Sequence, residues 1–167
     1  MKRNLISMTC VLLTLIVLMG CATSKEKTAR KTEQADRVES ALAERHYKIA
    51  VNMMIDPSET EEKVNQLLPQ PYRLEVRNDS LYSFLPKNGN NWIMNTLGQG
   101  GLILLEPICS YQEVMTKKGK RHIEIGVENV EDSYTFLIDV TADGNSYISV
   151  YPRKRERISY YGNLILD

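Results

Sequence analysis

Beyond residue 45, apolar residues alternate with polar ones along most of the chain, and this period of two predicts β-strands. The first such segment starts at His46, has apolar residues at positions 47, 49, 51, 53 and 55, and ends at Asp56-Pro57. Asp143-Gly144 is a strong signal for a short hairpin. About eight or nine antiparallel strands are expected, in the segments 46–55, 72–76, 81–85, 102–108, 111–115, 123–127, 134–140, 146–151 and 158–166.

A different period precedes the strands. From Thr32 to Arg45 the composition favours a helix, with Ala35, Val38 and Leu42 spaced three and four apart. This apolar stripe is narrow, so we expect the helix to be stable only when it packs on the sheet. Residues 58–68 are ambiguous, because their pattern fits either a capped short helix or a strand.

The predicted fold class is α+β and mostly β. A sheet with one oily face must cover that face with the helix, with a second layer, or by curling on itself. We expect the N-terminal helix to pack on a curved antiparallel sheet of about eight or nine strands. A small lipocalin-like β-barrel is the alternative.

Composition agrees with one ordinary globular core, since 43% of the 167 residues are hydrophobic and 25% are charged. The chain carries 21 basic and 21 acidic residues, so no overall field attracts nucleic acid. We therefore expect no nucleic-acid partner.

The first residues have the features of an export signal. Lys2 and Arg3 precede an apolar stretch at residues 5–19, which is too short to span a bilayer core of ~30 Å as a helix. Its end, Leu18-Met19-Gly20-Cys21, resembles the lipobox of bacterial lipoproteins, in which acyl chains are attached to the Cys thiol and the chain is cut before it. We expect a signal peptide at 1–20, a lipidated Cys21 with a flexible tether at 21–31, and one α+β domain at 32–167.

The three cysteines fit this scheme. Cys10 leaves with the signal peptide and Cys21 carries lipid, so Cys109 has no partner for an internal disulfide. Cys109 follows an apolar run and is expected to be a small buried hydrophobic residue, with a reactive thiol as the alternative.

The long loop at residues 87–101 contains the only tryptophan and is the first candidate binding site. Trp92 is a candidate platform for a sugar or peptide, with Asn90 and Asn91 as polar contacts. In the alternative, Trp92 and its apolar neighbours fold back and close an open end of the core.

Signals for catalysis are weak. His46 and His122 are the only histidines and match no metal-binding spacing, so no metal or cofactor is expected. Glu124, Glu128 and Asp139 fit either an acid and base pair or a solvated sheet face. We expect a protein that is not an enzyme.

Two surface features remain. Residues 153–157, RKRER, form a basic cluster that suits phosphate groups on lipids, or equally a solvated turn at a sheet edge. Tyrosines at 147, 151, 160 and 161 hint at a stacking surface.

Residues 72–86 (YRLEVRNDSLYSFLP), 131–150 (EDSYTFLIDVTADGNSYISV) and 157–164 (RISYYGNL) resemble a family of Bacteroidetes envelope lipoproteins, domain of unknown function 4251. The likeness extends from about Val38 to the C-terminus, carries over no catalytic residue, and favours a strand at 63–68. It implies an outer-membrane lipoprotein that faces the periplasm. Asp79-Ser80-Leu81 also resembles the O-glycosylation motif of that phylum, which makes Ser80 a candidate acceptor.

The sequence therefore predicts a lipid-anchored, non-enzymatic module of the cell envelope whose partner is the membrane together with an envelope protein or glycan. The alternative is a carrier for a small hydrophobic ligand in a barrel or cupped sheet. A carbohydrate-active enzyme is the third hypothesis.

Overall fold

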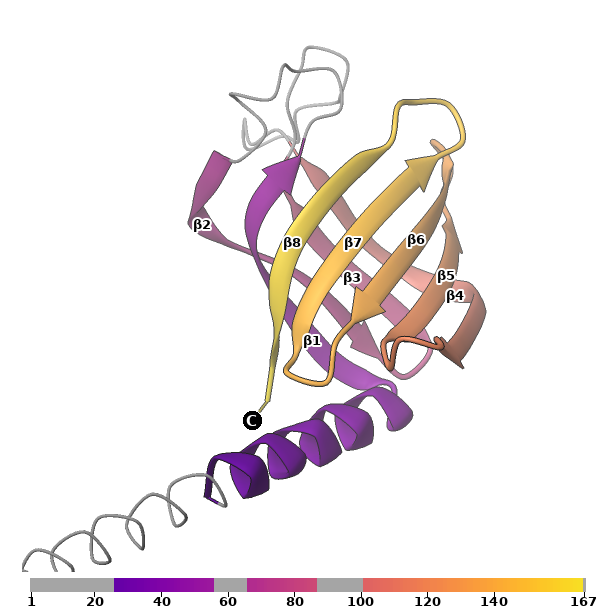
Figure 1. The fold of residues 1–167 in the computed structure, drawn as a ribbon. Helices are drawn as coiled ribbons and strands as arrows, with labels where there is room; N and C mark the ends of the chain where they lie inside the picture. The colour runs from indigo at the N-terminus through magenta and orange to yellow at the C-terminus, as the bar shows by residue number, and fades with distance from the viewer. Residues whose placement is uncertain (1–25, 56–65, 87–100, 167) are drawn as a thin grey trace, which may run out of the picture.

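The computed structural model describes residues 26–55, 66–86 and 101–166. Within them the chain forms one N-terminal helix and eight antiparallel strands that close into a barrel (Figure 1). The strands are β1 (His46–Ile55), β2 (Gln66–Arg77), β3 (Ser80–Leu85), β4 (Leu102–Met115), β5 (Arg121–Glu128), β6 (Ser133–Val140), β7 (Asn145–Pro152) and β8 (Ile158–Ile165).

Each strand pairs with its neighbour in sequence, and the last strand returns to the first. The seam between β1 and β8 is antiparallel and places Val51 opposite Gly162. The curved sheet expected first is thus corrected to a closed barrel, which was the alternative. Closure removes both free edges and lets the apolar face of every strand turn inward.

The barrel interior is filled by side chains from alternate positions. On β5 and β6, the apolar residues that the pattern placed on one face are all buried. The largest side chains that are fully buried include Phe136, Leu74, Leu81, Ile123, Ile138, Ile148 and Tyr160. This interior is a packed core, as expected for a small barrel of this strand number.

The inward face of β1 changes at a bulge. The register shifts between Val51 and Met53 against both neighbouring strands. Met54 is therefore buried, whereas Met53 and Ile55, which we expected on the apolar face, are only partly buried. One extra residue in a strand is enough to turn all later side chains to the other face.

Strand β2 resolves part of the ambiguity at 58–68. Residues 66–68 are strand, as the family resemblance favours, whereas residues 56–65 lie outside the described residues. Opposite the bulge, residues 68–71 of β2 face the single residue Asn52 of β1. Pro69 and Pro71 lie in this irregular stretch. Proline has no backbone N–H to donate, and here the regular hydrogen bonding between β1 and β2 is interrupted, so no sheet hydrogen bond is lost.

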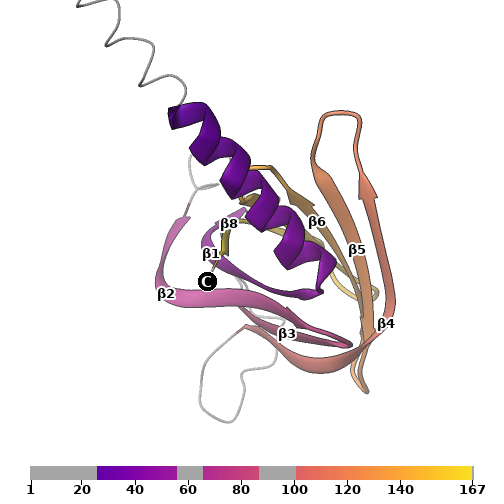
Figure 2. The same ribbon diagram turned by 90° about the horizontal axis from the view of Figure 1, so that it is seen from below.

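Strand β4 replaces two of the expected strands. Its first half pairs with β3 up to Pro107, and its second half pairs with β5 from Ile108 onward. The strand continues through a register shift between Ile108 and Ser110 and so joins the segments 102–108 and 111–115, which we expected to be separate strands. Figure 2 shows β4 curving from one side of the barrel to the next.

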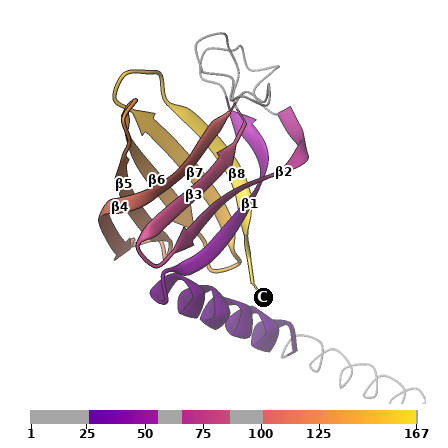
Figure 3. The same cartoon turned by 180° about the vertical axis from the view of Figure 1, so that it is seen from behind.

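The helix lies across the end of the barrel near the start of β1 (Figures 1 and 3). Val38 and Leu42 are buried in the core, and Gln34 donates a hydrogen bond of 2.8 Å to the Asp143 carbonyl in the turn between β6 and β7. The expected packing of the helix on the sheet is confirmed.

The helix includes residues 26–31, which we expected to belong to the flexible tether. These residues are exposed, and their helical spacing is supported by an Arg30–Glu26 ion pair of 2.6 Å. No helix in the described residues is long and apolar enough to cross a membrane.

Candidate functional site

Several predicted site residues lie outside the described residues, namely Cys21, Asn90, Asn91 and Trp92. Ser80 is described. It is the first residue of β3, it is half buried, and it pairs with Arg77 on one side and Pro107 on the other. Its neighbour Asp79 lies in the turn between β2 and β3, and the main-chain carbonyl of Asp79 accepts a hydrogen bond of 2.7 Å from the Ile108 amide.

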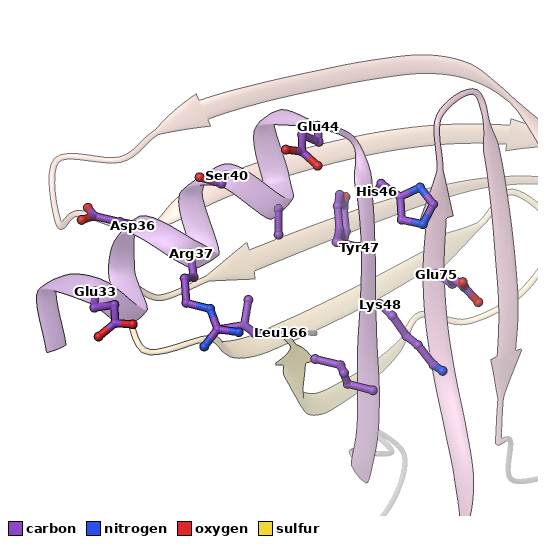
Figure 4. A pocket seen from close by; sticks show the side chains of 12 residues that line it. Glu33, Asp36, Arg37, Ser40, Glu44, His46, Tyr47, Lys48, Glu75 and Leu166 are labelled. Atoms are coloured by element: carbon purple, nitrogen blue, oxygen red, sulfur yellow. The ribbon is translucent and has the colours of Figure 1, made fainter. Parts of the chain in front are cut away.

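A groove of about 580 Å³ runs between the helix and the nearby ends of β1, β2 and β8 (Figure 4). Acidic side chains outnumber basic ones along the groove. Its hydrophobic side is formed by Tyr47, Ile165 and Leu166. The groove is lined by Glu33, Asp36, Arg37, Ser40, Ala41, Glu44, His46, Tyr47, Lys48, Glu75, Ile165 and Leu166.

Charges at the barrel side of the groove are already neutralised by neighbours. Glu75 accepts a bond of 2.7 Å from the Arg77 Nε, and Lys48 lies opposite Glu75 in the strand register. The hydrogen bond from Arg77 is the main cause of the lowered pKa of Glu75, which partial burial opposes and the charge of Lys48 reinforces. The groove thus has no unbalanced charge here to select an ion.

Beneath the helix, a polar cluster joins it to the barrel. Arg121 bonds to Glu39 on the helix and lies 3.4 Å from Glu113, which accepts a bond of 3.3 Å from the Tyr111 hydroxyl. The Arg45 guanidinium lies 4.2 Å from the centre of the Tyr111 ring. These ion pairs and the contact between Arg45 and the Tyr111 ring fix the position of the helix on the barrel, and we assign this cluster a structural role.

The histidines do not meet. His46 is exposed at the groove, whereas His122 is on the outer face of β5 and lies 2.6 Å from the Asp139 carboxylate of β6. No group of His, Cys, Asp and Glu able to hold a metal ion is present among the described residues.

The three carboxylates proposed as acid and base lie on the outer face of the barrel. Glu124 and Glu128 alternate with inward Ile123, Ile125 and Val127, and both are exposed. Asp139 lies on the same convex face, where its carboxylate is in contact with the His122 ring, 2.6 Å from Nδ1. Neither this face nor the register places the carboxylates in a cleft, so of the two possibilities the solvated sheet face describes them, and the acid and base pair is not assembled there.

The tyrosines divide between the two faces. Tyr160 points inward, is fully buried and donates a hydrogen bond of 2.9 Å to the Pro86 carbonyl, and burial raises its pKa. Tyr147 and Tyr161 are register partners on the outer face, with ring centres 5.1 Å apart. Of the four tyrosines, three can therefore belong to an outer stacking surface, and Tyr160 cannot.

The basic cluster at 153–157 connects β7 to β8. The Lys154 amide donates to the Asp132 carboxylate over 3.2 Å, and the Arg157 Nη1 donates to the Tyr151 hydroxyl over the same distance. The cluster is a turn, but it does not protect a sheet edge, because the closed barrel has none at this position.

Cys109 is exposed, which makes the expectation of a buried residue wrong. It lies on the outer side of β4, where Ile103 and Leu105 are also exposed. An apolar run that covers both faces of a strand gives no alternation, so the sequence offered no signal for the side on which Cys109 lies.

The comparisons with known proteins identify a family and a fold. The family described as Domain of unknown function (DUF4251) matches residues 29–164. The crystal structure of a DUF4251 family protein from Bacteroides eggerthii DSM 20697 is similar, with a TM-score of 0.62 and 13% sequence identity over 80% of this chain and 87% of that one. No curated protein matches the sequence.

Proposed function

Because the chain belongs to the DUF4251 family, we propose that it is a lipid-anchored module of the cell envelope that binds another envelope component and carries out no chemistry. The observation that carries this proposal is the filled barrel. Side chains from every strand of the barrel occupy its interior, whereas the Arg121–Glu39 pair lies under the helix and the His122–Asp139 pair lies on the outer face. Binding then belongs to the outer surface and the loops.

The helix suits a spacer between anchor and barrel. Glu33 lines the groove and Gln34 is hydrogen bonded to the barrel, so residues 26–32 project beyond these contacts (Figure 1). At 1.5 Å per residue, this projecting part is about 10 Å long. With acyl chains on Cys21, the barrel is held away from the headgroups and its outer face stays open to the periplasm.

The anchor follows from the lipobox-like Leu18-Met19-Gly20-Cys21. Two or more acyl chains bind a bilayer far more firmly than a single myristoyl chain, because each buried methylene contributes ~0.8 kcal/mol. We assign the protein to the periplasmic face of the outer membrane. The loop that contains Asn90, Asn91 and Trp92 is the first place to look for a contact with a partner.

Membrane fractionation tests the proposal. In cells, the wild-type protein is expected to enter the detergent phase and to sediment with outer membranes, whereas Cys21→Ser is expected to accumulate with its signal peptide uncut. Chemical crosslinking in the same cells, compared between wild type and Trp92→Ala, tests the binding role of the loop. Wild-type protein in the aqueous phase contradicts the anchor, and an unchanged crosslinking pattern contradicts the loop.

A role as carrier of a small hydrophobic ligand is a second hypothesis for the function of this barrel. The described interior argues against it, since Ile49, Leu74 and Phe136 are fully buried in the core. Extraction of the purified protein with organic solvent, followed by mass spectrometry, decides this point, because a stoichiometric lipid would support the carrier.

A further inference from the structure

The outer face of β5 to β8 carries a continuous row of polar and aromatic side chains. The strand register places His122 opposite Asp139, Asp139 opposite Tyr147, and Tyr147 opposite Tyr161. With strands about 4.8 Å apart, this row extends over about 14 Å. We call the surface the tyrosine face and define it by His122, Asp139, Tyr147, Tyr151, Arg157 and Tyr161.

The aromatic part of the tyrosine face is open to solvent. Tyr161 is 45% exposed and Tyr151 is 39% exposed. The Tyr147 and Tyr161 rings are tilted by 52° to each other, and on the same two strands the hydroxyls of Ser149 and Ser159 lie 3.0 Å apart and are buried although they face outward. The exposed rings therefore lie beside a pair of serine hydroxyls that are already hydrogen bonded to each other.

The Tyr147 phenol is held in place by these two serines. Burial raises its pKa, but hydrogen bonds with Ser159 and Ser149, together with the charge of Arg157, outweigh burial, and the pKa is lowered. The ring is therefore fixed from below, and a ligand that stacks on Tyr161 beside it loses little side-chain entropy on the protein side.

Polar groups stand at both ends of the aromatic part. At one end, His122 Nδ1 and one Asp139 oxygen are 2.6 Å apart, and each side chain keeps about a third of its surface exposed, at 35% and 36%. At the other end, the Arg157 guanidinium lies 5.7 Å from the Tyr151 ring centre. Exposed ring faces flanked by carboxylate, imidazole and guanidinium groups match a pyranose, whose C–H side stacks and whose rim of hydroxyls needs hydrogen-bond partners.

The charges of the surface select among sugars. Glu124 is exposed on the outer face of β5, two residues from His122, and its register partner Leu137 is two residues from Asp139. Carboxylates thus border the row on the β5 and β6 side, and Arg157 is the cation that reaches the Tyr151 ring. A strand of acidic sugars or a nucleic acid meets like charge there, whereas a neutral sugar does not.

We propose that the tyrosine face binds an uncharged oligosaccharide strand, with Tyr161 and Tyr147 as the stacking platform and Asp139, His122 and Arg157 as partners for its hydroxyls. The inference rests on the proposed function, because it names the component that the anchored module binds. It assigns this binding to the barrel wall, on residues separate from the Trp92 loop.

Calorimetric titration of the full-length protein tests the proposal, in an amine-oxide detergent that carries no sugar headgroup. The probes are the hexamers of glucose, of N-acetylglucosamine and of galacturonic acid, the last as the acidic sugar. Saturable binding of a neutral hexamer is expected, and Tyr161→Ala is expected to weaken it about tenfold or more. Tyr161→Phe retains the ring and is expected to stay within about twofold of wild type.

Tyr82→Ala is the matched control, because Tyr82 is also an outward tyrosine beside an arginine, on the far strand β3, where the Arg73 guanidinium lies 5.1 Å from its ring centre. This variant should bind as wild type. The proposal is overturned if neither neutral hexamer binds, if Tyr161→Ala binds as tightly as wild type, or if the galacturonic acid hexamer binds more tightly than both. None of these results concerns the anchor, which membrane fractionation tests separately.

Discussion

Replacement of Gly162 by Ala is expected to open the seam that closes the barrel. Gly162 is on β8, between β1 and β7, opposite Val51 and Ser146. A methyl group on its Cα would lie well inside van der Waals contact of the Ala50 carbonyl oxygen, and 3.0 Å from a methyl of Ile49. The Ala50 oxygen belongs to the backbone of β1, so no side-chain rotation relieves the clash.

The size of the effect follows from this geometry. Forcing an extra methyl group into a packed site costs about 1–3 kcal/mol, and more when backbone must move. We expect Gly162→Ala to lower the free energy of unfolding by about 3 kcal/mol. For a folded unit of this size, the loss corresponds to a Tm lower by about 6–12 °C.

Urea unfolding followed by circular dichroism measures this loss. Gly126→Ala is the matched control, because a methyl group there meets the exposed Ser110 hydroxyl, which can rotate away. The control should lose less than about 1 kcal/mol, and less still together with Ser110→Ala. If Gly162→Ala unfolds at the same urea concentration as wild type, β1 and β8 do not approach as closely as described, and the argument from closure fails.

Three further predictions concern the helix, the hairpin turn and the free thiol. Leu42→Ala on the helix should lower the free energy of unfolding by about 2–5 kcal/mol in the same urea assay, because Leu42 is fully buried; an unchanged midpoint would show that the helix does not pack on the barrel. A hydrogen bond from Thr141 is the main cause of the lowered pKa of Asp143, so the stability that Asp143 contributes is complete above its pKa in the unfolded chain and is lost as the pH falls through its lower folded pKa. Unfolding measured between about pH 6 and pH 2 should therefore show a smaller acid loss for Asp143→Asn than for wild type, and equal losses would contradict this assignment. Cys109 should be alkylated by a maleimide in the native protein, as peptide mass spectrometry will show, and labelling only after unfolding would contradict its exposure.

The alternation of apolar and polar residues was sufficient to predict most strands. On β6, Tyr134, Phe136, Ile138 and Val140 are all buried, as their spacing required. The Asp143-Gly144 turn also forms, with Gly144 at φ 84°, a conformation that glycine adopts without strain. These features depend on local chemistry, which a sequence displays directly.

Features that depend on distant partners were not predictable. Closure brings Val51 to Gly162, more than a hundred residues away, and no local pattern marks that pairing. The sequence carries no signal for the bulge after Val51 either, since Met53, Met54 and Ile55 are all apolar and could lie on either face of the strand. At residues 26–31 every residue except Ala29 is polar, so helix and tether could not be told apart.

The candidate site shows the same division. The sequence singled out Tyr147 and Tyr161 together as part of a stacking surface, yet gave no reason to join His122 and Asp139 to them. They meet because three successive strand pairings align their positions. A row of this kind is a property of register, which depends on turn lengths and on the closed barrel rather than on any short motif.

The lipid anchor is the central claim, and the mass of the amino-terminal peptide of the mature protein tests it most directly. Purified from membranes and digested, the chain should begin at Cys21, with a mass increased by a diacylglyceryl group on the sulphur. A chain that begins at Cys21 without added mass, or one that still carries residues 1–20, would contradict the account.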